Sequence, residues 1–458
     1  MSVQPASREG AEVPGPLSRA HAGTDSALHH IVIVGGGAGG LILATKLGNG
    51  LGKRKRARIT LIDTSLTHVW KPLLHEVAVG TLDSHKDDVI YLGHAADHHF
   101  RFQQGRMDGL DRGKREVILA PVLDDAGHEI ISSRRVSYDT LVIAIGSICN
   151  DFGTPGVKEH CLFLDTQEQA EHVQQRLLIS CLRAQTQEGP LAEGQLNIAI
   201  VGAGATGVEL AAELHKATRQ LVAYGLDRID PERDVKISLI EAGATVLPAL
   251  PKRLSEATLR ELHRLNVQVY TEERVVEVTS SGIATHSGRF IPAELKVWAA
   301  GVKAPEFLST LGLAANRINQ LIVDATLRVS GDDAIFAIGD CACYVPPGGD
   351  RAVPPRAQAA YQQALLLAKS LRDRLDGKPL RKFVYKDYGS LISLSYGSVG
   401  NLMGNLLGSV MIEGWLARLT YLSLYKKHQL ALHGVIWVVL ATFINFLRRK
   451  TEPRLKLH

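Results

Sequence analysis

Short apolar runs that end in glycine recur along the chain. Residues 31–34 form one such run, and the arrangement returns at 197–201. An uninterrupted run of this length, rich in β-branched residues, is typical of a parallel strand buried on both faces. Further runs predict strands at 58–62, 141–145, 235–240 and 334–338. Helices are expected between strands, at about 41–51 and 208–218. Alternating strands and helices, with a glycine-ended unit that occurs twice, predict an α/β protein with two Rossmann-like domains.

The first glycine cluster, at 35–40, has the spacing of a dinucleotide-binding loop. Gly35 permits a tight turn, Gly37 lets the backbone approach a pyrophosphate, and Gly40 allows close packing of helix on strand. The helix N-terminus that follows favours phosphate binding. Asp63 ends the next strand and is placed to accept hydrogen bonds from both ribose hydroxyls. A glycine-rich turn without a ligand is the alternative. The loop residues predicted to contact the nucleotide are Gly35, Gly37, Ala38, Gly39 and Gly40.

The second glycine cluster, at 202–207, has the same spacing, and its acid is Glu241. Glu241 lies 34 residues beyond the last glycine of the cluster, whereas about 20 is usual. A longer helix or an insertion around 219–233 would account for the difference. A carboxylate here would repel the extra phosphate of NADPH, so we expect a preference for NADH unless Glu241 points elsewhere. The loop residues predicted to bind NADH are Gly202, Gly204, Ala205, Thr206 and Gly207.

Two dinucleotide sites in one chain suggest a flavin and a nicotinamide that meet face to face. Several segments then resemble known families. The segment at 335–340 looks like the third flavin motif of two-dinucleotide-domain flavoproteins. Residues 67–76 resemble one branch, the type II single-subunit NADH:quinone oxidoreductases, and 357–362 matches that branch's AQxAxQ quinone-site pattern. The segments that look most like the proteobacterial respiratory members are 401–405, 411–414 and 453–458. The resemblance runs from about residue 29 to the end of the chain.

This resemblance implies an activity and a set of site residues. The activity is FAD-dependent oxidation of NADH with two-electron reduction of a membrane quinone, ubiquinone or menaquinone. The hydride would pass from NADH to N5 of the flavin, and the electrons from the flavin to the quinone. Catalytic roles are implied for Glu209, Gln358 and Gln362. Beyond the first loop, the residues implied to bind FAD are Asp63, Lys71, Ala144, Gly146, Asp340, Ala357 and Gln358. Those implied to lie near the nicotinamide are Glu209, Ala300 and Gly301.

The residues themselves give part of this picture. Two prolines at 354–355 predict a helix start, and Gln358 and Gln362, four apart, lie on one face of that helix, where they can donate to a quinone carbonyl. Small alanines at 357 and 360 would let a flat ring approach. An ordinary amphipathic helix is the alternative. Glu209 is expected in the first turn of its helix, where the dipole stabilises a carboxylate. Trp298 could belong to the nicotinamide site or to the core.

The five cysteines help to discriminate between flavoprotein classes. They show no CxxC spacing, and none lies at 64–80, where related disulfide reductases carry their redox pair. A reduced cytosolic chain is the simplest interpretation. The alternatives are an NAD(P)H-dependent ferredoxin reductase, a sulfide:quinone-type reductase, or a flavoprotein that acts as a redox-sensing module. Neither the Cys341 and Cys343 pair nor the histidines match a recognised metal site, so no metal is expected.

Charge and hydropathy mark the C-terminal end. The whole chain carries +5, and eight cations with a single acid lie at 415–458, so the remainder is net acidic and nucleic-acid binding is not expected. Residues 430–447 form an 18-residue apolar run with cations on both sides, after an aromatic segment at 415–425. Cations at both ends favour monotopic binding to anionic phospholipid over a span. We therefore expect a peripheral enzyme at the cytoplasmic face of the bacterial inner membrane, without proton pumping. A dimer interface, a core helix and a single span are the alternatives.

These observations predict a domain organisation. Residues 1–27 are expected to be a disordered leader, because they are rich in Pro, Gly, Ala and Ser. An FAD-binding domain is predicted at 28–160 and 320–382, with an NADH-binding domain at 161–319 between its two parts. Residues 383–458 are predicted to form a C-terminal membrane-associating helical segment. A homodimer is compatible with this scheme.

Overall fold

The structure is a computed structural model. The residues that it describes are 28–83, 88–124, 126–394, 397–404, 408–413, 426, 429–432, 434–448 and 455. The predicted leader at 1–27 and the aromatic segment at 415–425 lie outside the described residues.

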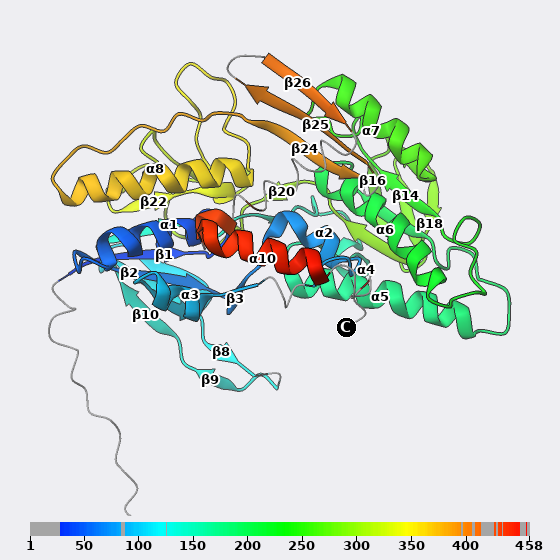
Figure 1. The fold of residues 1–458 in the computed structure, drawn as a ribbon, viewed down its shortest axis with the longest axis horizontal. Helices are drawn as coiled ribbons and strands as arrows, with labels where there is room; N and C mark the ends of the chain where they lie inside the picture. The colour runs from blue at the N-terminus through cyan, green and yellow to red at the C-terminus, as the bar shows by residue number, and fades with distance from the viewer. Residues whose placement is uncertain are drawn as a thin grey trace, which may run out of the picture.

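The first sheet is parallel throughout and has the order β22-β11-β1-β2-β5. Its strands are β1 (His29–Val34), β2 (Ala57–Asp63), β5 (Arg101–Gln104), β11 (Thr140–Ile143) and β22 (Ile335–Ala337). The helices α1 (Gly40–Leu47) and α8 (Ala357–Leu375) pack against each other on one face of the sheet (Figure 1). Because β22 and α8 come from the far end of the chain, this unit is assembled from two separate stretches of sequence.

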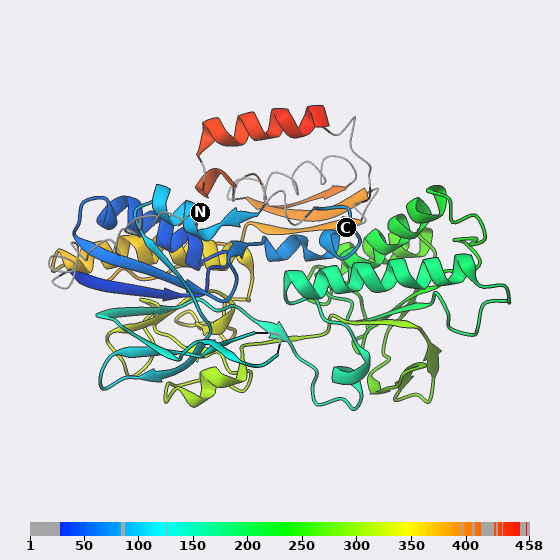
Figure 2. The ribbon, with the colours of Figure 1, turned by 90° about the horizontal axis from the view of Figure 1, so that it is seen from below.

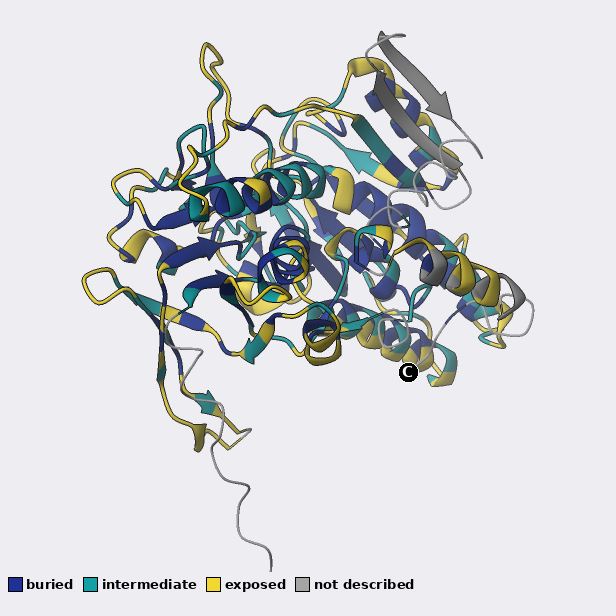
Figure 3. Ribbon diagram, turned by 60° about the vertical axis from the view of Figure 1, so that its left-hand side comes forward, coloured by how far each residue is buried: buried dark blue, intermediate teal, exposed yellow. Residues whose placement is uncertain are grey.

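The second sheet is also parallel and has the order β15-β14-β13-β19. Its strands are β13 (Ile198–Val201), β14 (Ile237–Ile240), β15 (Val267–Tyr270) and β19 (Leu295–Trp298). The accompanying helices are α5 (Gln167–Thr186), α6 (Ala205–Ala223) and α7 (Lys252–Arg264). A capping box of Thr166 and Gln169 starts α5. The central strands of both sheets are buried, whereas the edge strands β5 and β15 are largely not (Figure 3).

Two chain crossings connect the units. The strand β12 (Ile148–Cys149) leaves the first unit, and β20 (Val302–Lys303) returns beside it as its antiparallel partner. The second unit is therefore an insertion into the first, and Figure 2 shows the two side by side. The remaining strands are β3 (Thr67–His68), β4 (Val89–Ile90), β6 (Met107–Asp111), β7 (Glu116–Leu119), β8 (Val122–Leu123), β9 (Glu129–Ile131), β10 (Arg134–Ser137), β16 (Val275–Val278), β17 (Gly282–Thr285), β18 (Phe290–Pro292), β21 (Leu321–Ile322) and β23 (Ala342–Cys343). The remaining short helices are α2 (Leu74–Val77), α3 (Tyr91–Asp97) and α4 (Val157–His160).

The C-terminal region contains strands as well as a helix. The antiparallel strands β24 (Gly389–Leu394), β25 (Gly397–Gly404) and β26 (Gly408–Glu413) were not anticipated from the sequence. The inner side of β24 packs on α6, and its Ile392 and Leu394 join the core of the second unit. The glycine-rich sequence of β25 lacks a regular alternation of apolar and polar residues, which explains why the strand was missed.

The apolar run at 430–447 is interrupted in the structure. Gly434 has a φ of +78°, and α10 (Val435–Arg448) begins directly after it. A helix of 14 residues measures about 21 Å, less than the ~30 Å of a bilayer core. Among the described residues, no helix combines the length and apolar character that crossing a membrane requires. Figure 2 shows α10 at the outer edge of the molecule, on the same side as β24.

Candidate functional site: two dinucleotide loops and a buried carboxyl

The first glycine loop is both tight and accessible. Gly35 has a φ of +103°, and a Cβ there would collide with the Ala144 carbonyl group. A Cβ at Gly40 would collide with the Gly35 carbonyl oxygen, so the helix packs directly on the turn. At Gly37, in contrast, a Cβ would meet no atom within 4 Å. The loop therefore offers open space at the position where a pyrophosphate must approach the backbone.

Asp63 faces this loop. The Gly36 amide donates to Asp63 Oδ2 at 2.5 Å, and burial raises the pKa of the carboxyl. The sequence analysis missed Tyr91, which is buried and whose hydroxyl donates to the Gly36 carbonyl at 2.9 Å. A tyrosine distant in sequence offers no motif that would connect it with the loop. Tyr91 and Asp63 together hold Gly36 through its carbonyl and its amide.

The second loop repeats this geometry. Gly202 has a φ of +102°, and a Cβ there would collide with the backbone of Ala300. The carboxylate of Glu241 accepts from the Ala203 amide at 2.8 Å and from the Gly243 amide at 2.8 Å. Glu241 therefore points at the loop and not away from it. As in the first loop, the middle glycine, Gly204, borders open space.

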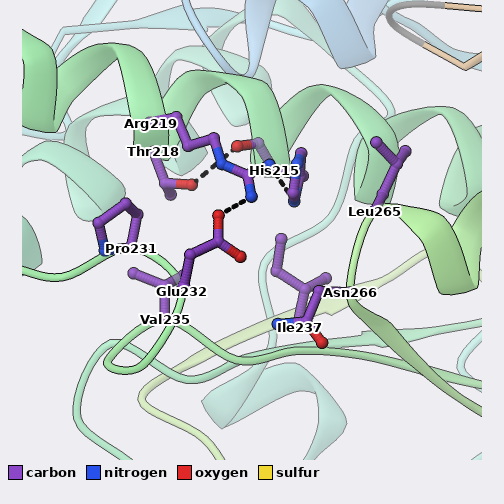
Figure 4. Close-up of a pocket in the computed structure, with 9 residues that line it drawn as sticks. All are labelled: His215, Thr218, Arg219, Pro231, Glu232, Val235, Ile237, Leu265 and Asn266. Carbon is purple, nitrogen blue, oxygen red and sulfur yellow. Dashed lines mark hydrogen bonds and ion pairs between the residues drawn. The ribbon is translucent and has the colours of Figure 1, made fainter.

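The long spacing before Glu241 has both of the causes considered from the sequence. Helix α6 extends over 19 residues, to Ala223, and a loop leads from there to β14. An ion pair between Arg219 and Glu232 ties this loop back to α6, beside a small pocket (Figure 4). The C-terminal half of α6 lines this pocket, whereas the glycine loop adjoins the N-terminus of the helix.

A second group of predicted flavin residues meets around Ser147. The Ser147 hydroxyl donates to Asp340 Oδ2 at 2.8 Å, and Lys71 Nζ donates to the Ser147 carbonyl at 2.6 Å. Gly146, with a φ of +85°, directly precedes this serine. Behind Asp340, the Gly339 amide donates to the buried side chain of Gln363 at 2.7 Å. Lys71 and Asp340 thus come together from positions 269 residues apart in the sequence.

The start of α8 differs in detail from the expectation. The helix begins at Ala357, so the two prolines lie outside its first turn. Ala360 is buried against Gly39 and Gly339, where it lets α8 pack on the first loop. The two predicted quinone glutamines are engaged within the protein. Gln358 Nε2 donates to the Gly389 carbonyl at 3.1 Å, and Gln362 Nε2 donates to the Lys386 carbonyl at 2.8 Å. Both amides therefore hold the segment that leads into β24.

Glu209 lies in the second turn of α6, not in the first as expected. The predicted stabilisation of its carboxylate by the helix dipole is therefore not the main influence on its pKa. Burial raises the pKa of Glu209 to about 8, with smaller contributions from Glu76 and Glu213, although the Ser393 amide donates to Oε1 at 3.0 Å. His75 Nδ1 lies 3.7 Å from Oε2. At neutral pH, Glu209 thus carries a proton inside the interface between α2, α6 and β24.

In the segment implied to lie near the nicotinamide, Trp298 belongs to the core, whereas Ala300 adjoins the second loop. Trp298 is buried, and its Nε1 donates to the Asn150 carbonyl at 2.8 Å, so this side chain belongs to the core. Ala300 packs against Gly202 of the second loop. Gly301 has a φ of +65°, and a Cβ there would collide with the Phe152 ring. Among the described residues, no group of three His, Cys, Asp or Glu side chains is arranged to hold a metal ion.

The arrangement fits two dinucleotides. Each glycine loop follows a central parallel strand, opens a helix, leaves open space above its middle glycine and is faced by a carboxylate. The first loop is adjoined by the Ser147 group, in which Lys71 and the half-buried Asp340 meet. The fold and the two loops define a two-domain flavin- and nicotinamide-dependent oxidoreductase.

Comparisons with known proteins agree with this class. The sequence model of the family described as "Pyridine nucleotide-disulphide oxidoreductase" matches residues 29–364. A type II NADH:quinone oxidoreductase from Haemophilus influenzae is 44% identical over 94% of this chain and 100% of its own length. A protein of the same description from Staphylococcus aureus is 28% identical over 82% of this chain and 90% of its own length. The solved structure of an NDH2 from Plasmodium falciparum in complex with NADH has a TM-score of 0.79 at 22% identity, covering 93% of this chain and 100% of that one.

This chain belongs to the pyridine nucleotide-disulphide oxidoreductases and, within them, to the type II NADH:quinone oxidoreductases. Family membership confirms the resemblance seen in the sequence, the α/β fold class, the enzyme class and the use of FAD and NADH.

Proposed function

We propose that the chain oxidises NADH and reduces a membrane quinone, with FAD bound at the first glycine loop and NADH at the second. The observation that carries this proposal is the pair of loops, each with its own carboxylate, in a chain that covers the full length of its Haemophilus relative. FAD, when bound, supplies the two-electron chemistry between NADH and quinone. In the overall reaction, NADH, one proton and quinone give NAD⁺ and quinol.

The residues of the first unit would bind and orient FAD. Asp63 would accept from the ribose hydroxyls, while Lys71 and Asp340 would hold the ribityl and ring region through the Ser147 group. In the second unit, Glu241 would hold the ribose of NADH and repel the extra phosphate of NADPH. The domain boundaries expected from the sequence, 28–160 with 320–382 for FAD and 161–319 for NADH, stay a proposal.

The proton and the quinone involve the residues between the units. Protonated Glu209 would supply the proton that accompanies the hydride equivalent of NADH to the quinone. Gln358 and Gln362 would orient the quinone carbonyl groups only after exchanging their present bonds to the 386–389 segment. Quinone binding is thereby coupled to the position of β24, whose Ser393 amide contacts Glu209.

The site of action would be the cytoplasmic face of the bacterial inner membrane. Val435, Val439 and Phe443 lie four residues apart on α10 and are 60–68% exposed. An exposed apolar stripe of this kind is typical of an interfacial helix. Leu440 and Ile444 widen it. The cations that flank the helix in the sequence would bind anionic headgroups, and the quinone would enter from the bilayer beside α10.

The test is steady-state oxidation of NADH by the holoenzyme with a panel of acceptors, with and without liposomes that contain anionic lipid. Quinone should be reduced with NADH, and liposomes should enhance the rate when the quinone is a long-chain one. A rate that is high with ferredoxin or a disulfide and absent with quinone would contradict the proposal. A homodimer built on α10 would instead give a lipid-independent rate and a twofold mass in solution.

A further inference from the structure

His75 faces the carboxyl of Glu209 inside the interface between α2 and α6. Its Nδ1 lies 3.7 Å from Oε2, and the two side chains are only 2% and 8% exposed. The other ring nitrogen, Nε2, is buried and has no hydrogen-bond partner within the described part of the chain. The second carboxyl oxygen, Oε1, accepts from the Ser393 amide of β24 at 3.0 Å. The carboxyl thus accepts from a backbone amide on one side and faces an imidazole on the other.

The surroundings disfavour a negative charge on this carboxyl. Glu76 from α2 and Glu213 from α6 are the charged neighbours that act on Glu209, and both raise its pKa. Lys216 lies 3.6 Å from Glu213 and compensates that side chain. Burial lowers the pKa of His75 to about 4, although a hydrogen bond from its ring to the Pro72 backbone carbonyl opposes this shift. Since Nε2 has no partner, this bond is made by Nδ1–H. At neutral pH the pair is therefore uncharged, with its ionisable proton on the carboxyl, so the 3.7 Å contact is not an ion pair.

When the proton leaves Glu209, a carboxylate is left in this buried and acidic interface. The His75 imidazole lies next to Oε2. If the Nδ1–H turns from the Pro72 carbonyl towards Oε2 and closes the gap from 3.7 Å to about 2.8 Å, an ordinary charged hydrogen-bond distance, it stabilises that carboxylate. We propose that His75 is a positioning residue for the proton donor, Glu209. His75 would donate to Oε2 of Glu209 and so make the carboxyl acidic enough to release its proton to the quinone.

This inference rests on the proposed function, in which one proton joins the hydride equivalent of NADH to form quinol. The O–H bond of Glu209 breaks, an O–H bond of the quinol forms, and Glu209 afterwards regains a proton from water. His75 undergoes no net change, because it donates a hydrogen bond without transferring its own proton. Its effect lies in the acidity of Glu209.

The direct test is an infrared titration of the Glu209 carboxyl in the resting holoenzyme, with the band assigned by its loss in Glu209→Gln. His75→Leu removes the donor and should move the titration upward by about one to two pH units. His75→Gln keeps a donor of similar size and should restore most of the original value. His215→Leu is the matched control, because His215 is a buried histidine on α6, the helix of Glu209, and lies beside Arg219. This substitution should leave the titration of Glu209 unchanged.

The pH profile of quinone reduction gives a second readout. In His75→Leu the alkaline limb of the rate profile should move to higher pH together with the titration of Glu209. The limiting rate of quinone reduction at lower pH should fall. Bleaching of the flavin by NADH in a single turnover should be retained. A titration that stays in place in His75→Leu, or that moves equally far in His75→Gln, would overturn the inference. Because the infrared titration needs no turnover, its outcome is separate from that of the proposed function, which fails if the parent enzyme does not reduce quinone.

Discussion

Replacing Glu209 by glutamine should make the protein more stable at alkaline pH. Glutamine has nearly the same shape as a protonated glutamate and can still accept the Ser393 amide, but it cannot ionise. The carboxyl of the parent protein has a pKa of about 8 in the folded state, against an ordinary value of 4.5. The substitution therefore removes the cost of forming a buried carboxylate and leaves the packing of α2, α6 and β24 intact.

The magnitude follows from the two pKa values. Between pH 4.5 and about 8, the unfolded chain has released this proton and the folded chain still holds it, so folding stability falls as the pH rises. Each pH unit costs about 1.4 kcal/mol, which sums to an upper limit of about 5 kcal/mol above pH 8. Below pH 4.5 the cost is absent. For a chain of 458 residues, 5 kcal/mol corresponds to a difference of about 5 °C in the melting temperature.

The assay is thermal unfolding of the parent, Glu209→Gln and a surface control, Glu256→Gln, at a fixed scan rate from pH 5 to pH 9. The melting temperature of Glu209→Gln should match that of the parent near pH 5 and exceed it increasingly up to pH 8. The Glu256→Gln control should run parallel to the parent, because Glu256 is exposed on α7. A difference between Glu209→Gln and the parent that is the same at pH 5 and pH 9 would refute the burial argument.

Three further predictions concern the other parts of the site. Tyr91→Phe removes the bond to Gly36 and should weaken FAD retention by about two- to tenfold, measured as FAD fluorescence released on dilution, with the secondary structure unchanged. Glu241→Gln should lower the preference for NADH over NADPH by about tenfold in kcat/KM; an unchanged ratio would mean that Glu241 does not read the ribose. Val439→Asp with Phe443→Asp should abolish flotation with anionic liposomes, whereas Ile130→Asp, at an equally exposed apolar position of β9, should not.

The parts of the fold that depend on local pattern could be predicted from the sequence. The strands that became β1 and β13 are continuous apolar runs, and Gly35 and Gly202, which directly follow them, occupy positions where only glycine fits. The acid of each loop also follows from its place at the end of the neighbouring strand, as the amide contacts of Asp63 and Glu241 show. Local sequence is sufficient here because the loop, the strand end and the helix start lie within one supersecondary unit.

Features that depend on contacts between distant segments could not be predicted. The environment of Glu209 is made by α2 and β24, which lie more than 130 residues away on either side, so its helix position alone suggested a stabilised carboxylate. The bonds of Gln358 and Gln362 to the 386–389 segment depend on the same C-terminal strands, whose glycine-rich sequence gave no strand signal. Tyr91 reaches the first loop only through the tertiary fold.

The central claim is that electrons pass from NADH to quinone through one bound flavin, and sequential-mixing stopped-flow spectroscopy tests it most directly. The purified holoenzyme is mixed first with NADH under anaerobic conditions and then with a quinone, while the flavin absorbance is followed. The account predicts that NADH bleaches the flavin and that the quinone restores its colour. A flavin that NADH does not bleach, or that stays bleached in the presence of quinone and regains its colour with ferredoxin or a disulfide, would contradict it.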